Sequence, residues 1–221
     1  MNVLQAVEGL AADLERIGGE PPPAPRWQQD WFPRLDAAAA YAIVRTTRPK
    51  RIVEVGSGHS TRFLARAVAD GGLDTRITAI DPSPRATLKG LPVEWIARPV
   101  QEAELPALEA GDILFIDSSH QYRPGSDLDF LFHGVLPRLR SGVRVHFHDI
   151  FLPDDYPGGW AWRRYNEQEA VAELLAEGGD EGYSQEFSSH QTLKSGALNG
   201  VLARLPLLAG AIESSLWLRK R

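Results

Sequence analysis

The sequence predicts an α/β fold: a doubly wound, Rossmann-like, mostly parallel sheet of about seven strands, with an antiparallel C-terminal strand and an N-terminal helical extension. From residue 51 onward, short apolar runs rich in β-branched residues alternate with stretches of helical spacing. Such alternation is typical of a parallel sheet covered by helices on both faces. The 43% hydrophobic and 24% charged residues are those of a packed globular domain.

The chain is expected to divide into a helical extension with a linker, residues 1–48, and an α/β domain, residues 49–221. Apolar residues recur every three or four positions in the first helix, which predicts one apolar stripe made of Val3, Val7, Leu10, Leu14 and Ile17. This stripe packs against the domain or forms a homodimer contact. Residues 18–25, GGEPPPAP, end the helix because proline lacks an N–H and fixes φ. A second helix is expected over residues 35–47.

The strand candidates of the domain end in polar or glycine-containing turns, and they cover residues 51–55, 76–80, 93–97, 112–116 and 143–148. Helical spacing marks residues 63–68 and 128–136. After residue 150 the pattern predicts a helix over 165–179 and two further strands, 183–187 and 197–204. Because only a loop joins these two strands, we expect them to be antiparallel neighbours.

Charge and composition exclude several classes of function. With a net charge of −5 and no long basic run, the chain is not expected to bind nucleic acid. The absence of cysteine excludes disulfides, thiolate metal sites and a cysteine nucleophile. Acidic residues interrupt the first helix and no apolar run reaches 18 residues, so we expect no membrane association and a cytoplasmic location.

The first strand of the domain ends in a glycine turn, VEVGSGHSTRFL, residues 53–64. Glycines at 56 and 58 let a ligand approach the main chain, and the helix that follows offers free N–H groups to an anion. Ser60 or Thr61 would cap this helix or contact the ligand. An NAD(P)-linked oxidoreductase is one candidate, but its G-x-G-x-x-G fingerprint needs a third glycine where this chain has Thr61.

Three strand-end motifs together resemble the class I S-adenosylmethionine-dependent methyltransferases, close to their small-molecule O-methyltransferase branch. These are EVGSG after the first strand, AIDPSP after the second and GDILFIDSSH at the fourth, and the likeness covers roughly residues 40–205. The resemblance implies methyl transfer from S-adenosylmethionine to a small-molecule acceptor, with oxygen favoured over nitrogen. A module that binds the cofactor without catalysis is the remaining alternative.

The same resemblance implies a set of cofactor-binding residues. Gly56, Ser57 and Gly58 would lie under the methionine part, with Glu54 orienting the loop or the amine and Ser60 near the carboxylate. Asp81, which ends the second strand, would accept hydrogen bonds from the ribose hydroxyls, as in dinucleotide sites. The remaining members are Val100 and Gln101 near the adenine, and Asp117 and Ser118 at the end of the fourth strand.

Catalytic candidates follow the fourth and fifth strands, which we expect to be neighbours. His120 or His148 is a candidate general base, since imidazole titrates near neutral pH, and Asp149 would orient an imidazole or bind a metal. His146 is interpreted as a packed strand residue. Alternation sends Val143, Val145 and Phe147 to one face of the sheet and Arg144, His146 and His148 to the other.

A Mg²⁺ ion between Asp117 and Asp149 is a further hypothesis, because hard cations prefer carboxylate oxygens and acidify a bound hydroxyl. Metal-dependent O-methyltransferases have an Asp-Asn pair at the fifth strand, whereas this chain has Asp149-Ile150.

Residues 156–165, rich in tryptophan and tyrosine, are expected to form a lid over the acceptor or a covering flap without substrate contact. Arg163 and Arg164 would recognise an acidic acceptor or begin a solvated helix, and Asn166 and Glu167 would cap that helix or line the same edge.

Overall fold

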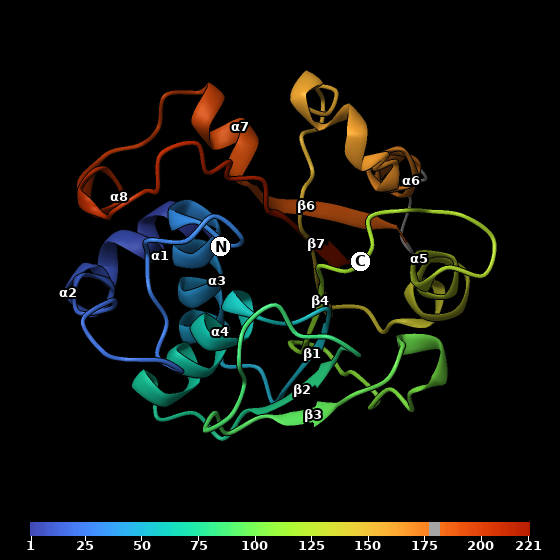
Figure 1. Ribbon diagram of the computed structural model, residues 1–221, viewed down its shortest axis with the longest axis horizontal. Helices are drawn as coiled ribbons and strands as arrows, with labels where there is room; N and C mark the ends of the chain where they lie inside the picture. Colours follow the sequence, from blue (N-terminus) through green and yellow to red (C-terminus); the bar gives the residue numbers. More distant parts are fainter. Residues whose placement is uncertain (177–181) are drawn as a thin grey trace.

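The computed structural model describes residues 1–176 and 182–221. These residues form a seven-stranded sheet in the order β3-β2-β1-β4-β5-β7-β6 (Figure 1). The first five strands are parallel, and β7 is antiparallel to both β5 and β6. The bounds are β1 Arg51–Val55, β2 Arg76–Ile80, β3 Glu94–Ile96, β4 Ile113–Ile116, β5 Arg144–Phe147, β6 Tyr183–Ser188 and β7 Leu216–Lys220. The predicted doubly wound α/β fold is confirmed.

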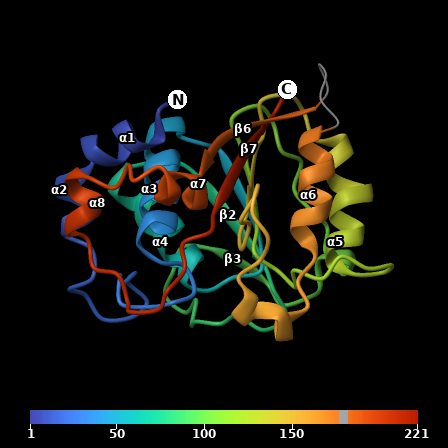
Figure 2. The same cartoon turned by 90° about the horizontal axis from the view of Figure 1, so that it is seen from above.

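Helices cover both faces of the sheet, as Figure 2 shows most directly. One face carries α1 Val3–Gly9, α2 Ala11–Glu15, α3 Arg34–Thr47, α4 His59–Asp70, α7 Ser189–Lys194 and α8 Gly200–Arg204. The other carries α5 Asp127–Phe130 and α6 Glu167–Ala176. The helical segment after α5 continues as a π turn, Leu131–Val135, and a 3₁₀ turn, Leu136–Arg138.

Because side chains alternate between the two faces of the sheet along each strand, each face has its own hydrophobic core. Val145 and Phe147 of β5 join the core beneath α5 and α6. His146 points to the opposite face, where its ring stacks on Phe115 with centroids 3.7 Å apart. The prediction that Val145 and Phe147 point to one face of the sheet and His146 to the other is therefore confirmed.

The N-terminal segment packs within the chain. Val3, Val7, Leu14 and Ile17 are buried in the core that includes α3 and α8. The expected single helix is two helices, α1 and α2, because the backbone leaves the helical conformation at Leu10, directly after a helix-weakening glycine. The stripe thus covers this protein's own core; a homodimer and the division of the chain at residue 48 stay predictions.

The sequence-based account of the C-terminus needs correction. Residues 197–204, predicted as a strand, contain α8, and the Glu8 carboxylate accepts a 2.8 Å hydrogen bond from the Val201 N–H in its first turn. The strand antiparallel to β6 is instead β7, which also pairs with β5 and buries Leu216, Trp217 and Leu218. The helix predicted over 165–179 is α6; residues 177–179 lie outside the described residues.

The described part of the chain has no helix that is both long and apolar enough to cross a membrane.

Candidate active site

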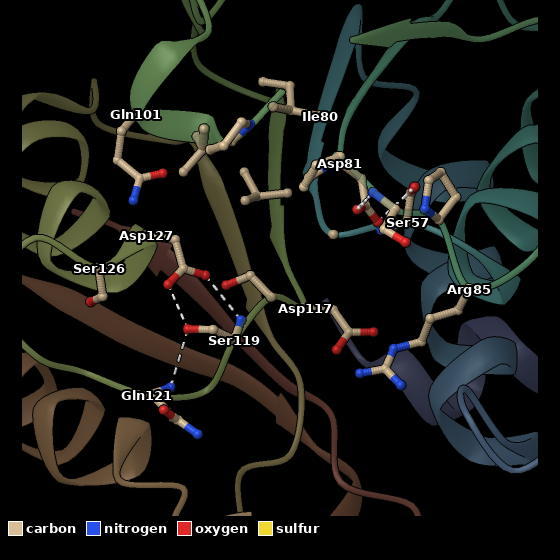
Figure 3. A pocket seen from close by; sticks show the side chains of 18 of the residues that line it. Ser57, Ile80, Asp81, Arg85, Gln101, Asp117, Ser119, Gln121, Ser126 and Asp127 are labelled. Atoms are coloured by element: carbon tan, nitrogen blue, oxygen red, sulfur yellow. Dashed lines mark hydrogen bonds between the residues drawn. The ribbon is translucent and has the colours of Figure 1, made fainter. Parts of the chain in front are cut away.

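A cavity of about 710 Å³ opens beyond the carboxyl ends of β1, β2 and β4, where the strand order reverses (Figure 3). Open α/β sheets bind their ligands at this point. Eight residues that were predicted to bind the cofactor or a metal lie in the cavity wall or in the glycine turn after β1. They are Gly56, Ser57, Gly58, Asp81, Val100, Gln101, Asp117 and Ser118. All of these except Gly58 contribute directly to the cavity wall.

The glycine turn brings the ends of β1 and β4 together. Gly56 has φ +80°, and a Cβ at this position would lie 1.7 Å from the carbonyl oxygen of Asp117. Only glycine fits so close to a neighbouring backbone. On its other side the turn is tied to β2, because the Ser57 N–H and hydroxyl both donate to Asp81 Oδ2, at 2.7 and 3.0 Å. Hydrogen bonds therefore connect the glycine turn directly to Asp81.

Glu54 and Ser60 lie behind the turn and do not line the cavity. The Ser60 hydroxyl donates to Glu54 Oε1 at 2.5 Å, and the Thr61 hydroxyl donates to Oε2 at 2.6 Å. Thr61 also accepts from the Gly58 N–H at 2.9 Å. Burial raises the pKa of Glu54 to about 8, against the lowering effect of these hydroxyl donors. Of its two predicted roles the geometry favours orienting the loop, and the side chain of Ser60 does not approach the cavity.

The wall opposite the turn contains residues that the sequence analysis did not single out. The Ser119 N–H donates to Asp127 Oδ2 at 2.9 Å, and both residues line the cavity. Gln101 donates from Nε2 to the Gly125 carbonyl at 3.3 Å. Ser119 lies within the GDILFIDSSH motif but was not singled out, and no short motif marks Asp127, because the contact joins the β4 loop to the start of α5.

A second, smaller cavity of about 110 Å³ adjoins the first and shares Asp117 and Arg85 with it. All three predicted catalytic residues line it: His120, His148 and Asp149. Its remaining wall includes the aromatic residues Trp31, Trp160 and Tyr165. The structure thus brings the candidate catalytic residues together next to the larger cavity, which they adjoin at Asp117.

His120 is held among three carboxylates. Its Nδ1 lies 2.8 Å from Glu167 Oε2, and its Nε2 lies 3.2 Å from Asp117 Oδ1 and 3.6 Å from Asp149 Oδ2. Burial lowers the pKa of His120, but hydrogen bonds with Asp117 and Glu167 outweigh it and hold the pKa well above its usual value. His120 is accordingly an imidazolium at neutral pH.

His148 has a similar environment on the other side of the carboxylates. Its Nε2 lies 3.2 Å from Asp36 Oδ2, and its Nδ1 lies 3.6 Å from Asp117 Oδ1 and 3.4 Å from Asp149 Oδ1. Burial opposes protonation, yet Asp117, Asp149 and Asp36 together raise the pKa of His148 to about 9. Burial alone would raise the pKa of Asp117, but the charges of His148 and His120 hold it well below its usual range.

Two of these residues have unusual backbone conformations. His120 and Asp149 have φ of 56° and 58°, in the left-handed region that non-glycine residues seldom adopt. This conformation costs each residue on the order of 1 kcal/mol. Both lie at the carboxyl ends of neighbouring strands, and the conformation turns their side chains into one cluster.

His146 is a packed strand histidine, as predicted. It is fully buried, stacks on Phe115 and lies 2.9 Å from the Ser215 hydroxyl through Nε2. Burial and the neighbouring His148 charge hold its pKa well below the usual value. It therefore stays neutral beneath the charged cluster.

The arrangement of Asp117 and Asp149 does not fit the hypothesised Mg²⁺ site. The imidazolium of His120 already contacts both carboxylates, and Mg²⁺ requires a near-octahedral set of oxygen ligands. Within residues 1–176 and 182–221, no group of three or more His, Asp or Glu side chains is placed to hold a metal ion.

Asp36 is the main member of the cluster that sequence reasoning missed. It is fully buried in α3, and it accepts from the N–H groups of Ser214 and Ser215 at 3.0 and 2.8 Å. A single acid in the alanine-rich stretch LDAAAAYAIV was the available signal. Glu167, expected to cap a helix or line this edge, is fully buried against His120.

The tryptophan-rich segment forms a 3₁₀ helix, Gly158–Arg163, at the edge of the small cavity. Trp160 and Tyr165 face the cavity, whereas Trp162 is 76% exposed. The Tyr165 ring lies 4.5 Å from the His120 ring. The segment thus contributes directly to the wall, which favours contact with the acceptor over a remote covering flap.

Comparisons with known proteins agree with this architecture. Residues 53–150 match the family model described as a methyltransferase domain. None of the curated proteins compared with the chain matches it. The methyltransferase PaMTH1 of Podospora anserina, solved with S-adenosylhomocysteine, has a TM-score of 0.53 at 15% identity and covers 100% of this chain and 88% of its own.

Two further solved structures are similar in the same way. The O-methyltransferase TomG of Streptomyces achromogenes, solved with S-adenosylmethionine, has a TM-score of 0.50 at 17% identity, covering 99% of this chain and 89% of its own. An O-methyltransferase of Bacillus cereus, solved with S-adenosylhomocysteine, has a TM-score of 0.50 at 14% identity, covering 100% and 91%. At these identities the likeness shows the fold. The chain therefore has the fold of these methyltransferases, and its residues 53–150 match a methyltransferase domain, in agreement with the resemblance of its strand-end motifs.

Proposed function

We propose that the protein transfers the methyl group of S-adenosylmethionine to an oxygen of a small-molecule acceptor. One observation carries the proposal: a cavity of nucleotide size and a small cavity lined by histidines and carboxylates meet at Asp117. The first cavity falls within the usual range of about 300–1,000 Å³ for ligand sites. The solved structures with this fold that hold S-adenosylmethionine or its product support the choice of cofactor.

Asp81 is the group proposed to hold the ribose. A carboxylate has about four acceptor sites, and three are occupied, two by the N–H and hydroxyl of Ser57 and one by the N–H of Ser83. One ribose hydroxyl can therefore bind without rearrangement, and the second requires the Ser57 hydroxyl to turn away. Ile80 and Val100 provide apolar surface for the adenine, and Gln101 provides an amide beside it.

The methionine part is proposed to lie along the glycine turn toward Asp117. When bound, the cofactor supplies a methyl group on a positively charged sulfonium, which leaves as a neutral thioether. The Asp117 carboxylate, held ionised by the neighbouring imidazoliums, is placed to attract this positive charge or the cofactor amine. Methyl transfer depends mainly on lining up the acceptor oxygen behind the methyl carbon.

His148 is the proposed general base. With a pKa of about 9, only about one molecule in a hundred has a neutral His148 at pH 7. That neutral form is, however, a stronger base than ordinary histidine, and its pKa approaches that of a phenolic hydroxyl, about 10. His120 stays protonated and positions Asp117 and Asp149, and its Nε2–H can donate to an acceptor oxygen that is losing its proton.

The function is tested by incubating the protein with S-adenosylmethionine and a panel of small hydroxylated aromatic compounds. We expect equimolar release of S-adenosylhomocysteine and of a product that is one methylene heavier. His148→Gln should reduce kcat by about 10²- to 10⁴-fold, the usual contribution of a positioned base. Cofactor binding without turnover on any acceptor would favour the non-catalytic module, and tight binding of NAD instead would favour the oxidoreductase.

A further inference from the structure

The small cavity has two arginines at its rim that form no ion pair with any acidic residue that the structure describes. Arg85 comes from the loop after β2, and Arg163 from the end of the 3₁₀ helix in the tryptophan-rich segment. Among the described residues, neither guanidinium has a carboxylate oxygen within 4.0 Å, although Asp30 lines the same cavity.

Aromatic rings hold both guanidinium groups in place. Arg85 Cζ lies 4.3 Å from the centroid of the Trp31 ring, and Arg163 Cζ lies 4.2 Å from that of Trp160. Arg163 also donates from Nη1 to the Tyr165 hydroxyl at 3.0 Å. Stacking covers the face of a guanidinium and leaves the N–H groups on its edge available, and these groups match carboxylate or phosphate oxygens in pairs.

Arg163 carries a second sign of a missing partner. Its Nε is buried and has no hydrogen-bond partner in the structure. A buried donor without a partner costs about 1–3 kcal/mol, so proteins seldom retain one without a reason. An anion can meet this need only if the Arg163 side chain shifts to expose Nε, because the atom is closed off from the cavity as it stands.

The charges of the cavity wall also favour an anion at the rim rather than at the floor. Two arginines, two histidines and three carboxylates line the cavity, the carboxylates being Asp30, Asp117 and Asp149. The two histidines at the floor are already engaged by carboxylates, whereas the two arginines are not. Figure 3 shows the Arg85 side chain on the side of the large cavity where Asp117 lies.

We propose that the acceptor carries an anionic group, a carboxylate or a phosphate, which Arg85 and Arg163 bind at the rim while its hydroxyl points to the His148 floor. This inference rests on the proposed function and adds the substrate class. The cavity of about 110 Å³ is somewhat smaller than the engineered 150 Å³ cavity that holds benzene. The enclosed part of the acceptor is therefore no larger than a single ring, and the anion reaches the arginines outside it.

The test measures binding of benzoate, phenyl phosphate and uncharged benzamide to the protein loaded with S-adenosylhomocysteine, by calorimetry or ligand-observed NMR. We expect at least one of the two anions to bind at least tenfold more tightly than benzamide, and the stronger one identifies the natural group. Arg85→Gln and Arg163→Gln should each weaken that binding at least tenfold, and Arg163→Gln, whose side chain lines only the small cavity, should keep S-adenosylhomocysteine binding. Arg164→Gln is the matched control, because Arg164 is exposed, adjacent and outside the cavity wall.

Two failures are distinguishable. A protein that does not bind S-adenosylhomocysteine overturns the proposed function and the inference with it. If the product of the cofactor binds normally but neither anion is preferred over benzamide, or if either glutamine variant keeps full anion affinity, the two-arginine site is wrong while methyl transfer stands.

Discussion

Protonation of His148 makes a measurable contribution to folding that depends on pH. The pKa rises from 6.5 to about 9 on folding, and each tenfold difference in proton affinity is worth about 1.4 kcal/mol. The charged imidazole therefore stabilises the folded state by about 3 kcal/mol. Because the folded pKa is the raised one, this stability is fully present below pH 6.5 and is lost as the pH rises through 9.

The assay is urea unfolding of the wild type and of His148→Gln at intervals from pH 6 to 10. The difference in the free energy of unfolding between the two proteins should shrink by about 3 kcal/mol across this range. His133→Gln is the control, since the His133 side chain is 70% exposed and its removal should leave the wild-type curve unchanged in shape. Parallel curves for wild type and His148→Gln would refute the assignment of an imidazolium at this site.

Four other outcomes follow from the same geometry. Asp81→Ala should weaken S-adenosylmethionine binding by 10- to 100-fold in calorimetry, since a hydrogen bond to a charged group is worth about 1.5–3 kcal/mol. The control variant Asp74→Ala, at an exposed position, should bind the cofactor as the wild type does. Equal affinities of the two variants for S-adenosylmethionine would contradict the ribose role of Asp81. Gly56→Ala should lower the free energy of unfolding by at least about 2 kcal/mol, because its Cβ would lie 1.7 Å from a carbonyl oxygen. Gly19→Ala is the control, since a Cβ at Gly19 has open space around it. A Gly56→Ala protein as stable as the wild type would contradict the close approach of β1 and β4. The kcat should increase with pH up to about 9 and become flat in His148→Gln, and a wild-type profile that is already flat above pH 7 would exclude His148 as the base. Dialysis against EDTA should leave turnover unchanged, and a loss restored by Mg²⁺ would contradict the imidazolium bridge.

The parts of the fold and site that depend on local sequence were predictable. The glycine turn follows β1 directly, and the positions of Asp81 and Asp117 at the ends of β2 and β4 come from the strand pattern alone. Placement at one edge of a parallel sheet then brings these residues into one cavity.

Long-range contacts account for what the sequence did not reveal. The raised pKa of His148 comes from Asp117 and Asp149 and also from Asp36. Asp36 lies 112 residues earlier in the chain, on a helix whose pattern indicates only an apolar face. The strand β7 contains only three buried apolar residues before Arg219 and Lys220, and its place between β5 and β6 is decided by tertiary pairing. Ser60 was expected near the cofactor, but the buried Glu54 carboxylate provides a nearer acceptor for its hydroxyl.

A crystal structure with S-adenosylhomocysteine tests the central claim most directly. The account predicts ribose hydroxyls within hydrogen-bond distance of Asp81, and a cofactor sulfur beside Asp117 that faces the small cavity lined by His148. A nucleoside bound outside the cavity at β1, β2 and β4, or a sulfur turned away from His148, would contradict it.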